Sequence, residues 1–168
     1  MARLFALDEG FPQPLIDAAT PYFADLRLVP IRNIDRRLAE LDDWQVLLAI
    51  HHHPDGFDGL ITTDDSMLNQ PRELAAVRQA TLTLVITHAA GHDPIKATGL
   101  SLAHLDYVCA QTRADEAQIW DLVARSRPGR SPMGFIERVA QHQHRDVDEI
   151  WAEARLTRAE LAHDPLAD

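Results

Sequence analysis

The sequence is poor in cysteine, in basic residues and in long apolar runs. Its 168 residues include a single cysteine, Cys109, so no disulfide can form within the chain, as is typical of proteins in a reducing cytosol. No apolar run approaches the roughly 18 residues of a membrane span. The N-terminal stretch meets acid at Asp8, which leaves no room for the apolar region of a signal peptide. We therefore expect a soluble, cytoplasmic protein that contacts no membrane.

The deficit of basic residues excludes binding to polyanions by overall electrostatic attraction. Sixteen Lys and Arg stand against 26 Asp and Glu, which gives a formal net charge of -10 at pH 7. Nucleic acids and anionic membranes repel such a chain, so bulk electrostatic attraction to either is excluded. The acid is concentrated in residues 1–66, which hold twelve acidic and five basic residues. A compact domain gathers carboxylates for a reason, and this local surplus points to a site.

Short apolar runs alternate with helical patterns over residues 1–111. The apolar runs predict strands at residues 3–7, 26–31, 59–63 and 81–87. The helical patterns lie at residues 14–24, 36–52, 72–80 and 94–111. This alternation predicts an α/β fold with three layers, α/β/α, around a mostly parallel sheet of about four strands. Because Pro30 has no N–H to donate, we expect the second strand at an edge of the sheet.

The remainder of the chain, residues 112–168, shows no strand signal. Helices are expected at residues 112–125, 132–143 and 146–156, followed by a short final turn. We therefore divide the chain into an α/β domain at residues 1–111 and a C-terminal helical extension at residues 112–168. Four large apolar residues of the extension should pack against the main domain or, if exposed, form a partner surface: Trp120, Phe135, Ile136 and Trp151.

Three aspartates fall where a parallel sheet binds its ligands. Asp8 follows the first strand and Asp64 the third, which places both at the carboxyl edge of the sheet. Asp43 lies near the start of the helix that leads into the third strand, and a right-handed crossover brings that position to the same edge. Converging carboxylates repel one another unless a cation neutralises them, and oxygen ligands select Mg²⁺ or Mn²⁺. Taken singly, each aspartate is better explained as a turn or cap residue; together they predict a metal site.

Three motifs resemble those of PIN-like domains, in the branch whose first strand ends Leu-Asp-Glu-x-x-Pro. The first motif is Leu-Asp-Glu-Gly-Phe-Pro at residues 7–12. The second, an Asp followed by apolar residues and Ala on a helix, is Asp-Trp-Gln-Val-Leu-Leu-Ala at residues 43–49. The third is Thr-Thr-Asp-Asp-Ser-Met at residues 62–67, where Ser66 and Met67 depart from the Asp and Phe of the family. The resemblance covers about residues 3–110 and leaves the C-terminal third unexplained.

The resemblance implies a metal-dependent ribonuclease fold like that of VapC-type toxins in bacterial toxin–antitoxin pairs. The implied reaction is hydrolysis of RNA phosphodiester bonds, with one or two Mg²⁺ or Mn²⁺ ions activating a water. It also implies RNA as substrate, an antitoxin protein as a candidate partner, and a homodimer. Two alternatives stay open. One is a degenerate PIN-like protein that binds a partner or assembles without cleaving, and the other is a different metal-dependent phosphoryl-transfer enzyme that uses the same crevice.

The resemblance also assigns candidate site residues. Asp8, Asp43 and Asp64 match the motif carboxylates, which implies that they bind the metal and carry the catalysis. Asp65 is a further candidate ligand because it can substitute for the missing fourth acid. Residues expected near the ligands, either as neighbouring carboxylates or as hydroxyls that bond to a ligand carboxylate, are Glu9, Asp42, Thr62 and Thr63.

Two other clusters give weaker hypotheses. The histidines at residues 51–53, and His88 with His92, suggest zinc but lack the four N or S ligands of a typical site. Histidines at a helix end are more simply explained as partial caps. The only basic cluster is expected to form a solvated loop, with contact to RNA phosphates or to an acidic partner as the alternative: Arg125, Arg127 and Arg130.

Overall fold

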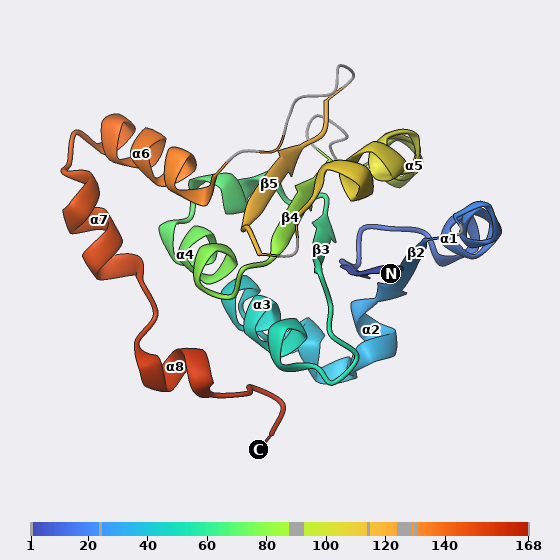
Figure 1. The fold of residues 1–168 in the computed structure, drawn as a ribbon, viewed down its shortest axis with the longest axis horizontal. Helices are drawn as coiled ribbons and strands as arrows, with labels where there is room; N and C mark the ends of the chain where they lie inside the picture. The colour runs from blue at the N-terminus through green and yellow to red at the C-terminus, as the bar shows by residue number, and fades with distance from the viewer. Residues whose placement is uncertain are drawn as a thin grey trace.

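Five parallel strands form the centre of the computed structural model, which describes residues 2–23, 25–87, 93–113, 115–123, 129 and 131–167. The strands lie in the order β2-β1-β3-β4-β5 (Figure 1). Their bounds are β1 (Arg3–Leu7), β2 (Leu26–Pro30), β3 (Gly59–Thr62), β4 (Thr83–Ile86) and β5 (Gln118–Asp121). The first four strands were predicted, and β2 lies at an edge of the sheet, as the proline at its end indicated.

Helices connect and cover these strands. The α-helices are α1 (Gln13–Ala19), α2 (Ile31–Ile34), α3 (Asp43–His52), α4 (Pro71–Gln79), α5 (Pro94–Gln111), α6 (Pro132–Gln143), α7 (Val147–Ala154) and α8 (Arg158–Ala162). The described residues also form the 3-10 helices η1 (Thr20–Tyr22), η2 (Arg36–Glu40) and η3 (Asp65–Asn69). The helices predicted around residues 72–80, 94–111, 132–143 and 146–156 are present with small shifts at their ends. In the described part of the chain, no helix combines the length and apolarity needed to cross a membrane.

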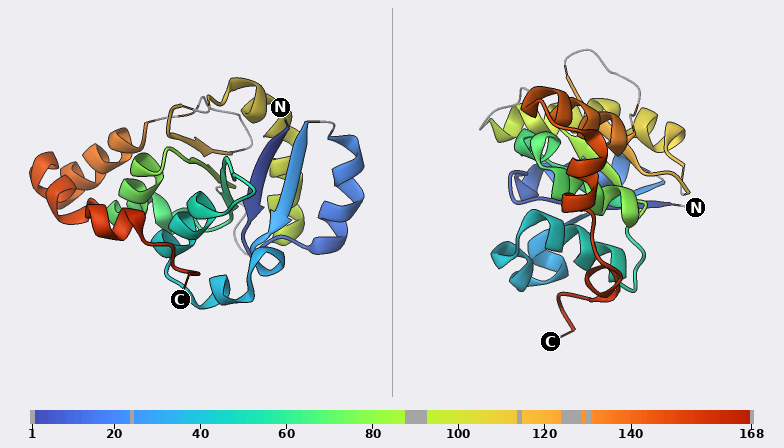
Figure 2. Two further views of the ribbon diagram at one scale, coloured as in Figure 1. Left: turned by 60° about the horizontal axis from the view of Figure 1, so that its bottom comes forward. Right: turned by 90° about the vertical axis from the view of Figure 1, so that its left-hand side faces the viewer.

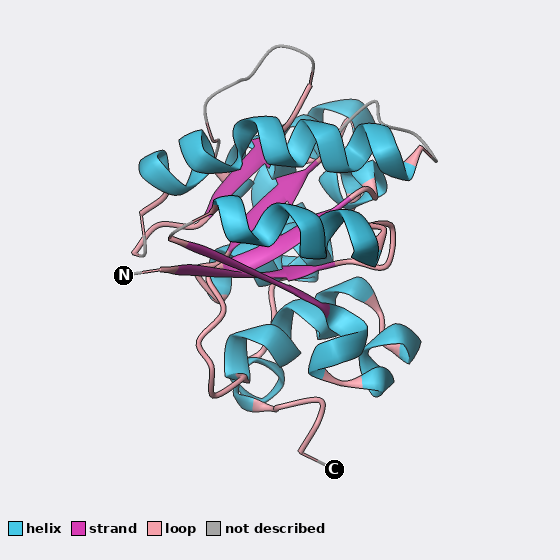
Figure 3. Cartoon of the chain, turned by 90° about the vertical axis from the view of Figure 1, so that its right-hand side faces the viewer, coloured by secondary structure: helices cyan, strands magenta, loops and turns pink. Residues whose placement is uncertain are grey.

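Both faces of the sheet are buried. Successive strand residues point to opposite faces, so Leu4 and Leu84 belong to one core and Phe5 and Val85 to the other. The first core includes residues of α3, α4 and α6, and the second includes residues of α1 and α5. Figure 3 shows helices on both sides of the strands. The fold is α/β with a fully parallel sheet, compatible with the predicted three layers, and the described residues form five strands where about four were expected.

The helix predicted at residues 112–125 was wrong, because this segment contains strand β5. Thr112, which resembled a helix start, instead closes α5: its hydroxyl donates to the Val108 carbonyl at 2.7 Å. In β5, Ile119 and Trp120 are both buried, each on a different face of the sheet. A four-residue strand buried on both sides shows no alternation of polar and apolar residues, so its pattern did not distinguish it from a helix.

The helix predicted at residues 36–52 is divided into η2 and α3. Leu41 and Asp42 are extended between the two helices. The Asp42 N–H donates to Oε1 of Gln45 at 3.1 Å, which fixes the start of α3. The break suspected from the paired aspartates therefore lies immediately before Asp43.

The C-terminal segment, α6 to α8 and the residues after them, wraps around the helical layer formed by α3 and α4 (Figure 2). Gln79 of α4 exchanges two hydrogen bonds with the backbone of Leu156, at 2.8 and 3.1 Å. Farther along, Nε2 of His52 lies 2.8 Å from the Leu161 carbonyl, and Arg37 donates to the Leu166 carbonyl at 3.0 Å. Along its length, the segment is thus hydrogen-bonded first to α4, then to α3 and then to η2.

Three of the four large apolar residues predicted to pack against the main domain lie in the core. Trp120, Phe135 and Ile136 are each at most 2% exposed, which confirms the core interpretation over a partner surface. Trp151 is half-buried, with the Arg78 guanidinium carbon 4.7 Å from the centre of its ring.

Candidate functional site

The order of the strands places the candidate site between β1 and β3. β2 lies on one side of β1, whereas β3, β4 and β5 lie on the other, so the chain order reverses at this point. Open parallel sheets bind ligands outside the carboxyl ends of the strands at such a reversal. Asp8 follows β1 directly, and its N–H donates to the Ile61 carbonyl of β3 at 3.0 Å. Asp8 is therefore held at the end of the β1–β3 ladder.

Thr62, the last residue of β3, forms hydrogen bonds with two of the predicted site residues. Its buried hydroxyl donates to Oδ2 of Asp8 at 2.7 Å and accepts the Asp64 N–H at 3.0 Å. The other oxygen of Asp8 accepts the Glu9 N–H at 2.7 Å. The hydrogen bond expected from Thr62 or Thr63 to a candidate carboxylate is thus made by Thr62, and both oxygens of Asp8 are fixed in direction.

Asp43, the first residue of α3, is close enough to these carboxylates to be perturbed by them. Partial burial raises the pKa of Asp43, and the negative charges of Asp64, Asp8 and Asp42 raise it further. A cavity of about 90 Å³, with room for several waters, is lined by both Asp8 and Asp43. Asp64 lies outside this cavity, where its Oδ1 accepts the Ser66 N–H at 2.8 Å and caps η3.

The chemistry of these donors fits a hard divalent cation. Among the described Lys, Arg and His residues, none forms an ion pair with Asp8, Asp43 or Asp64. Over the same described ranges, no three His, Cys, Asp or Glu side chains converge on a single metal position. Mg²⁺ needs only one or two carboxylates, because waters and substrate phosphates complete its octahedron. The fit is therefore to a hydrated ion between Asp8 and Asp43 rather than to a closed cage.

The other predicted residues are distributed around this centre. Asp42 adds to the charge near Asp43, and Glu9 lines the same small cavity as Asp8. Thr63 lines a separate cavity of about 580 Å³ beside α1. Asp65 lines a third cavity, of about 750 Å³, which also contains residues of β5 and α6. Thr63 and Asp65 are thus not brought to the Asp8–Asp43 cavity.

Glu73, in the first turn of α4, was not predicted from the sequence. Burial raises the pKa of its carboxyl group, a backbone hydrogen bond opposes the shift, and the charges of Asp43 and Asp42 add to it. An acid in the first turn of a helix is favoured by the helix dipole alone. Glu73 therefore carried no signal of a site in the sequence, apart from following the third motif by a few residues.

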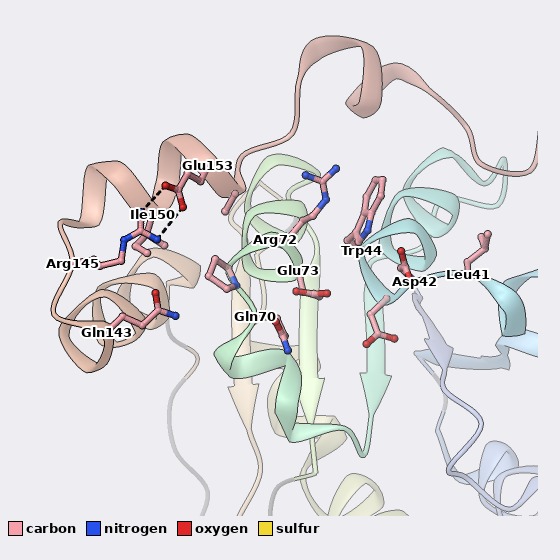
Figure 4. Close-up of a pocket in the computed structure, with 13 residues that line it drawn as sticks. Leu41, Asp42, Trp44, Gln70, Arg72, Glu73, Gln143, Arg145, Ile150 and Glu153 are labelled. Atoms are coloured by element: carbon pink, nitrogen blue, oxygen red, sulfur yellow. Dashed lines mark hydrogen bonds and ion pairs between the residues drawn. The ribbon is translucent and has the colours of Figure 1, made fainter.

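Asp43 also lines a larger groove, shown in Figure 4. This groove has a volume of about 700 Å³ and lies between the start of α3, the start of α4 and the α6–α7 turn. We call it the interhelical groove, and its polar lining residues are Asp42, Asp43, Trp44, Gln70, Arg72, Glu73, Gln143, Arg145 and Glu153.

Of the histidine and arginine clusters, the structure describes only the histidines at residues 51–53. The rings of His51 and His52 contact each other edge to face, with centroids 5.0 Å apart, and His53 packs in the same way on Phe57. Burial lowers the pKa of His51, as does the neighbouring His52. The remaining members of these clusters lie outside the described residues: His88, His92, Arg125, Arg127 and Arg130.

Comparisons with known proteins give no match: the chain matches no protein-family model, no curated protein and no solved structure. The PIN-like resemblance therefore stays a prediction that rests on the three motifs and their order. The position of the acidic residues in the fold is an independent observation, because it follows from the strand order and the contacts of Asp8, Thr62 and Asp43.

Proposed function

We propose that this protein is a Mg²⁺- or Mn²⁺-dependent endoribonuclease that hydrolyses RNA phosphodiester bonds. The observation that carries the proposal is that Asp8 and Asp64 follow β1 and β3, and that Asp43, at the start of α3, is close enough to be perturbed by both. Their mutual repulsion raises the pKa of Asp43 beyond the effect of burial, and no described cation relieves it. A divalent cation relieves such repulsion and so explains why the fold tolerates it.

The roles of the chain's own residues follow from their contacts. Asp8 and Asp43 would hold the ion from two sides of the small cavity, and Asp64 would contribute charge or a water-mediated contact. Thr62 orients Asp8, because a hydroxyl that donates to a ligand carboxylate fixes its direction. When bound, the ion would polarise the scissile phosphate and lower the pKa of an attacking water.

The choice of RNA as substrate rests on the resemblance and is compatible with the net charge of -10. A chain of this charge repels a polyanion unless bound cations supply local positive charge. RNA binding should therefore require the metal, which distinguishes this proposal from a basic RNA-binding protein. The toxin role, the antitoxin partner and the homodimer are parts of the same proposal that rest on the resemblance alone.

A second candidate function is a degenerate PIN-like module that binds a partner without cleaving. The observation that favours it is the absence, among the described residues, of three side chains converging on one metal position. In this case Asp64 serves as the cap of η3 and Asp8 as an acceptor for Thr62, and neither has a catalytic role.

Cleavage of single-stranded RNA separates the two candidates. The protein should cleave RNA in Mg²⁺ or Mn²⁺, stop when a chelator is added, and lose the activity in Asp8→Asn while keeping its fold by circular dichroism. Asp17→Asn is the matched control, since Asp17 is exposed on α1 and lines none of the cavities that contain the candidate site residues. Absence of cleavage in both metals, or equal cleavage by Asp8→Asn, overturns the nuclease proposal and favours the binding module.

A further inference from the structure

We call Asp8, Asp43 and Asp64 the acidic centre. The interhelical groove adjoins this centre at Asp43. Asp43 lines both the 90 Å³ cavity that contains Asp8 and the 700 Å³ groove between α3, α4 and the α6–α7 turn. A volume of this size lies within the range of about 300–1,000 Å³ that is typical of small-molecule sites. A polymeric ligand bound in the small cavity would therefore extend past Asp43 into the groove.

The charges of the groove disfavour a phosphate. Its lining includes the carboxylates of Asp42, Asp43 and Glu73. Its two arginines are already neutralised. Arg145 donates to both oxygens of Glu153, at 2.5 and 3.0 Å (Figure 4).

Arg72 is held by two contacts on the same side of the groove as Trp44. Its guanidinium donates to Glu160 of α8 at 2.5 Å, and its Cζ lies 4.1 Å from the centre of the Trp44 ring. Guanidinium planes and aromatic rings are the surfaces on which proteins stack unpaired bases. The groove thus offers a stacking surface without a free positive charge.

Two glutamine amides supply the remaining polar groups. Gln70 precedes α4 and Gln143 ends α6, so the two approach the groove from different helices (Figure 4). Neither side chain forms a hydrogen bond with any other described residue. Each amide offers donors and an acceptor together, which is the combination that pairs with the edge of a nucleobase.

We propose that the interhelical groove binds one unpaired nucleobase of the RNA substrate, beside the phosphate that is cleaved at Asp8 and Asp43. The inference rests on the proposed function and adds to it a base-binding subsite. Gln70 and Gln143 bond to the edge of the base, and the Arg72–Trp44 pair provides the stacking surface. The carboxylates exclude phosphate from the groove, so that the base enters it and the phosphate stays at the metal. The substrate is accordingly single-stranded RNA, with a preference for the base at this position.

Free nucleosides test the subsite without any metal or cleavage, because they carry a base and no phosphate. Adenosine, guanosine, cytidine and uridine are titrated separately into the full chain while amide and indole resonances are followed by NMR, with ribose as the control. At least one nucleoside should shift the side-chain amides of Gln70 and Gln143 and the indole of Trp44 saturably, and ribose should not. Absence of any saturable shift at these residues overturns the proposal.

A matched pair of variants tests whether the amide is responsible. Gln143→Ala should weaken binding of the preferred nucleoside about threefold to tenfold, as expected for the loss of one or two hydrogen bonds. Gln141→Ala removes the same side chain from the same helix outside the groove and should leave binding unchanged. Equal affinities of the two variants contradict the assignment.

The outcomes separate this inference from the proposed function. If nucleosides bind in the groove and RNA is never cleaved, the base subsite stands and the nuclease proposal fails. If RNA is cleaved in a metal-dependent way and nucleosides leave the groove resonances unchanged, the nuclease proposal stands and the base subsite fails.

Discussion

Thr62→Val is the substitution that should most clearly expose how the acidic centre is built. Valine has nearly the shape of threonine, so the change removes a hydroxyl from a fully buried position without creating a cavity. Two hydrogen bonds disappear: the 2.7 Å bond to the Asp8 carboxylate and the 3.0 Å bond from the Asp64 N–H. A bond to a charged group contributes about 1.5–3 kcal/mol and a neutral one about 0.5–1.5 kcal/mol. We therefore expect a loss of about 2–4.5 kcal/mol in the free energy of unfolding.

Thermal and urea unfolding measure this loss. For a chain of this length, 1 kcal/mol corresponds to a shift of about 2–4 °C, so the midpoint should fall by roughly 4–18 °C. Thr63→Val is the matched control, because Thr63 is the adjacent threonine and its hydroxyl bonds to no described residue. The control should change stability by less than about 0.5 kcal/mol. Equal effects of the two substitutions would refute the role given to Thr62.

Metal affinity provides an independent measure of the same contact. Removing a group that orients a ligand typically weakens metal binding about 10- to 100-fold. Thr62→Val should therefore bind Mn²⁺ more weakly than Thr63→Val at a temperature where both variants are folded. A loss of stability without any change in metal affinity would mean that Thr62 supports the fold and not a metal ligand.

Three further predictions concern charge. Burial and the charges of Asp64 and Asp8 raise the pKa of Asp43, so the folded state favours its protonated form. That stabilisation is complete below the unfolded pKa of 3.8 and is lost as the pH rises through the folded pKa. Asp43→Asn should therefore be more stable than the wild type in urea at pH 7, and the difference should vanish in acid. Hydrogen bonds from the Thr157 backbone and from Arg72 lower the pKa of Glu160 from 4.5 to about 2. Glu160→Gln should therefore lose stability at pH 7, and the loss should shrink as the pH falls from 4.5 toward 2, which urea titrations at several pH values would check. Burial raises the pKa of the Cys109 thiol from 9.0 to about 11, which predicts about 100-fold less thiolate and correspondingly slow alkylation by iodoacetamide at pH 8.

Most of the fold could be predicted because its signals are local. Buried strands β1 to β4 appear as short apolar runs that end in acid, threonine or proline, and Ser131 with Pro132 marks the start of α6 through a side-chain cap at 3.3 Å. β5 could not be recognised, because its pairing with β4 and its burial between the two cores are contacts with distant residues that its own four residues do not indicate.

The site could be predicted only for those residues that lie next to the predicted ends of strands and helices. Asp8 and Asp64 were found because each directly follows a predicted strand. Asp43 was found because it lies near the start of the helix that leads into β3. Glu73 and the interhelical groove were not found, because they depend on how α4 packs against α3 and against the C-terminal helices. Contacts between segments separated by some 70 to 90 residues, such as Arg72 with Glu160, leave no pattern in the sequence.

Direct titration of Mn²⁺ into the protein, without RNA, tests the central claim that Asp8 and Asp43 form a cation site. Calorimetry or the electron paramagnetic resonance signal of free Mn²⁺ gives the affinity and the number of ions bound. Wild-type protein and Asp17→Asn should bind Mn²⁺ saturably, and Asp8→Asn and Asp43→Asn should each lose that binding. Indistinguishable titrations for wild type and Asp8→Asn would contradict the account, whatever the result with RNA.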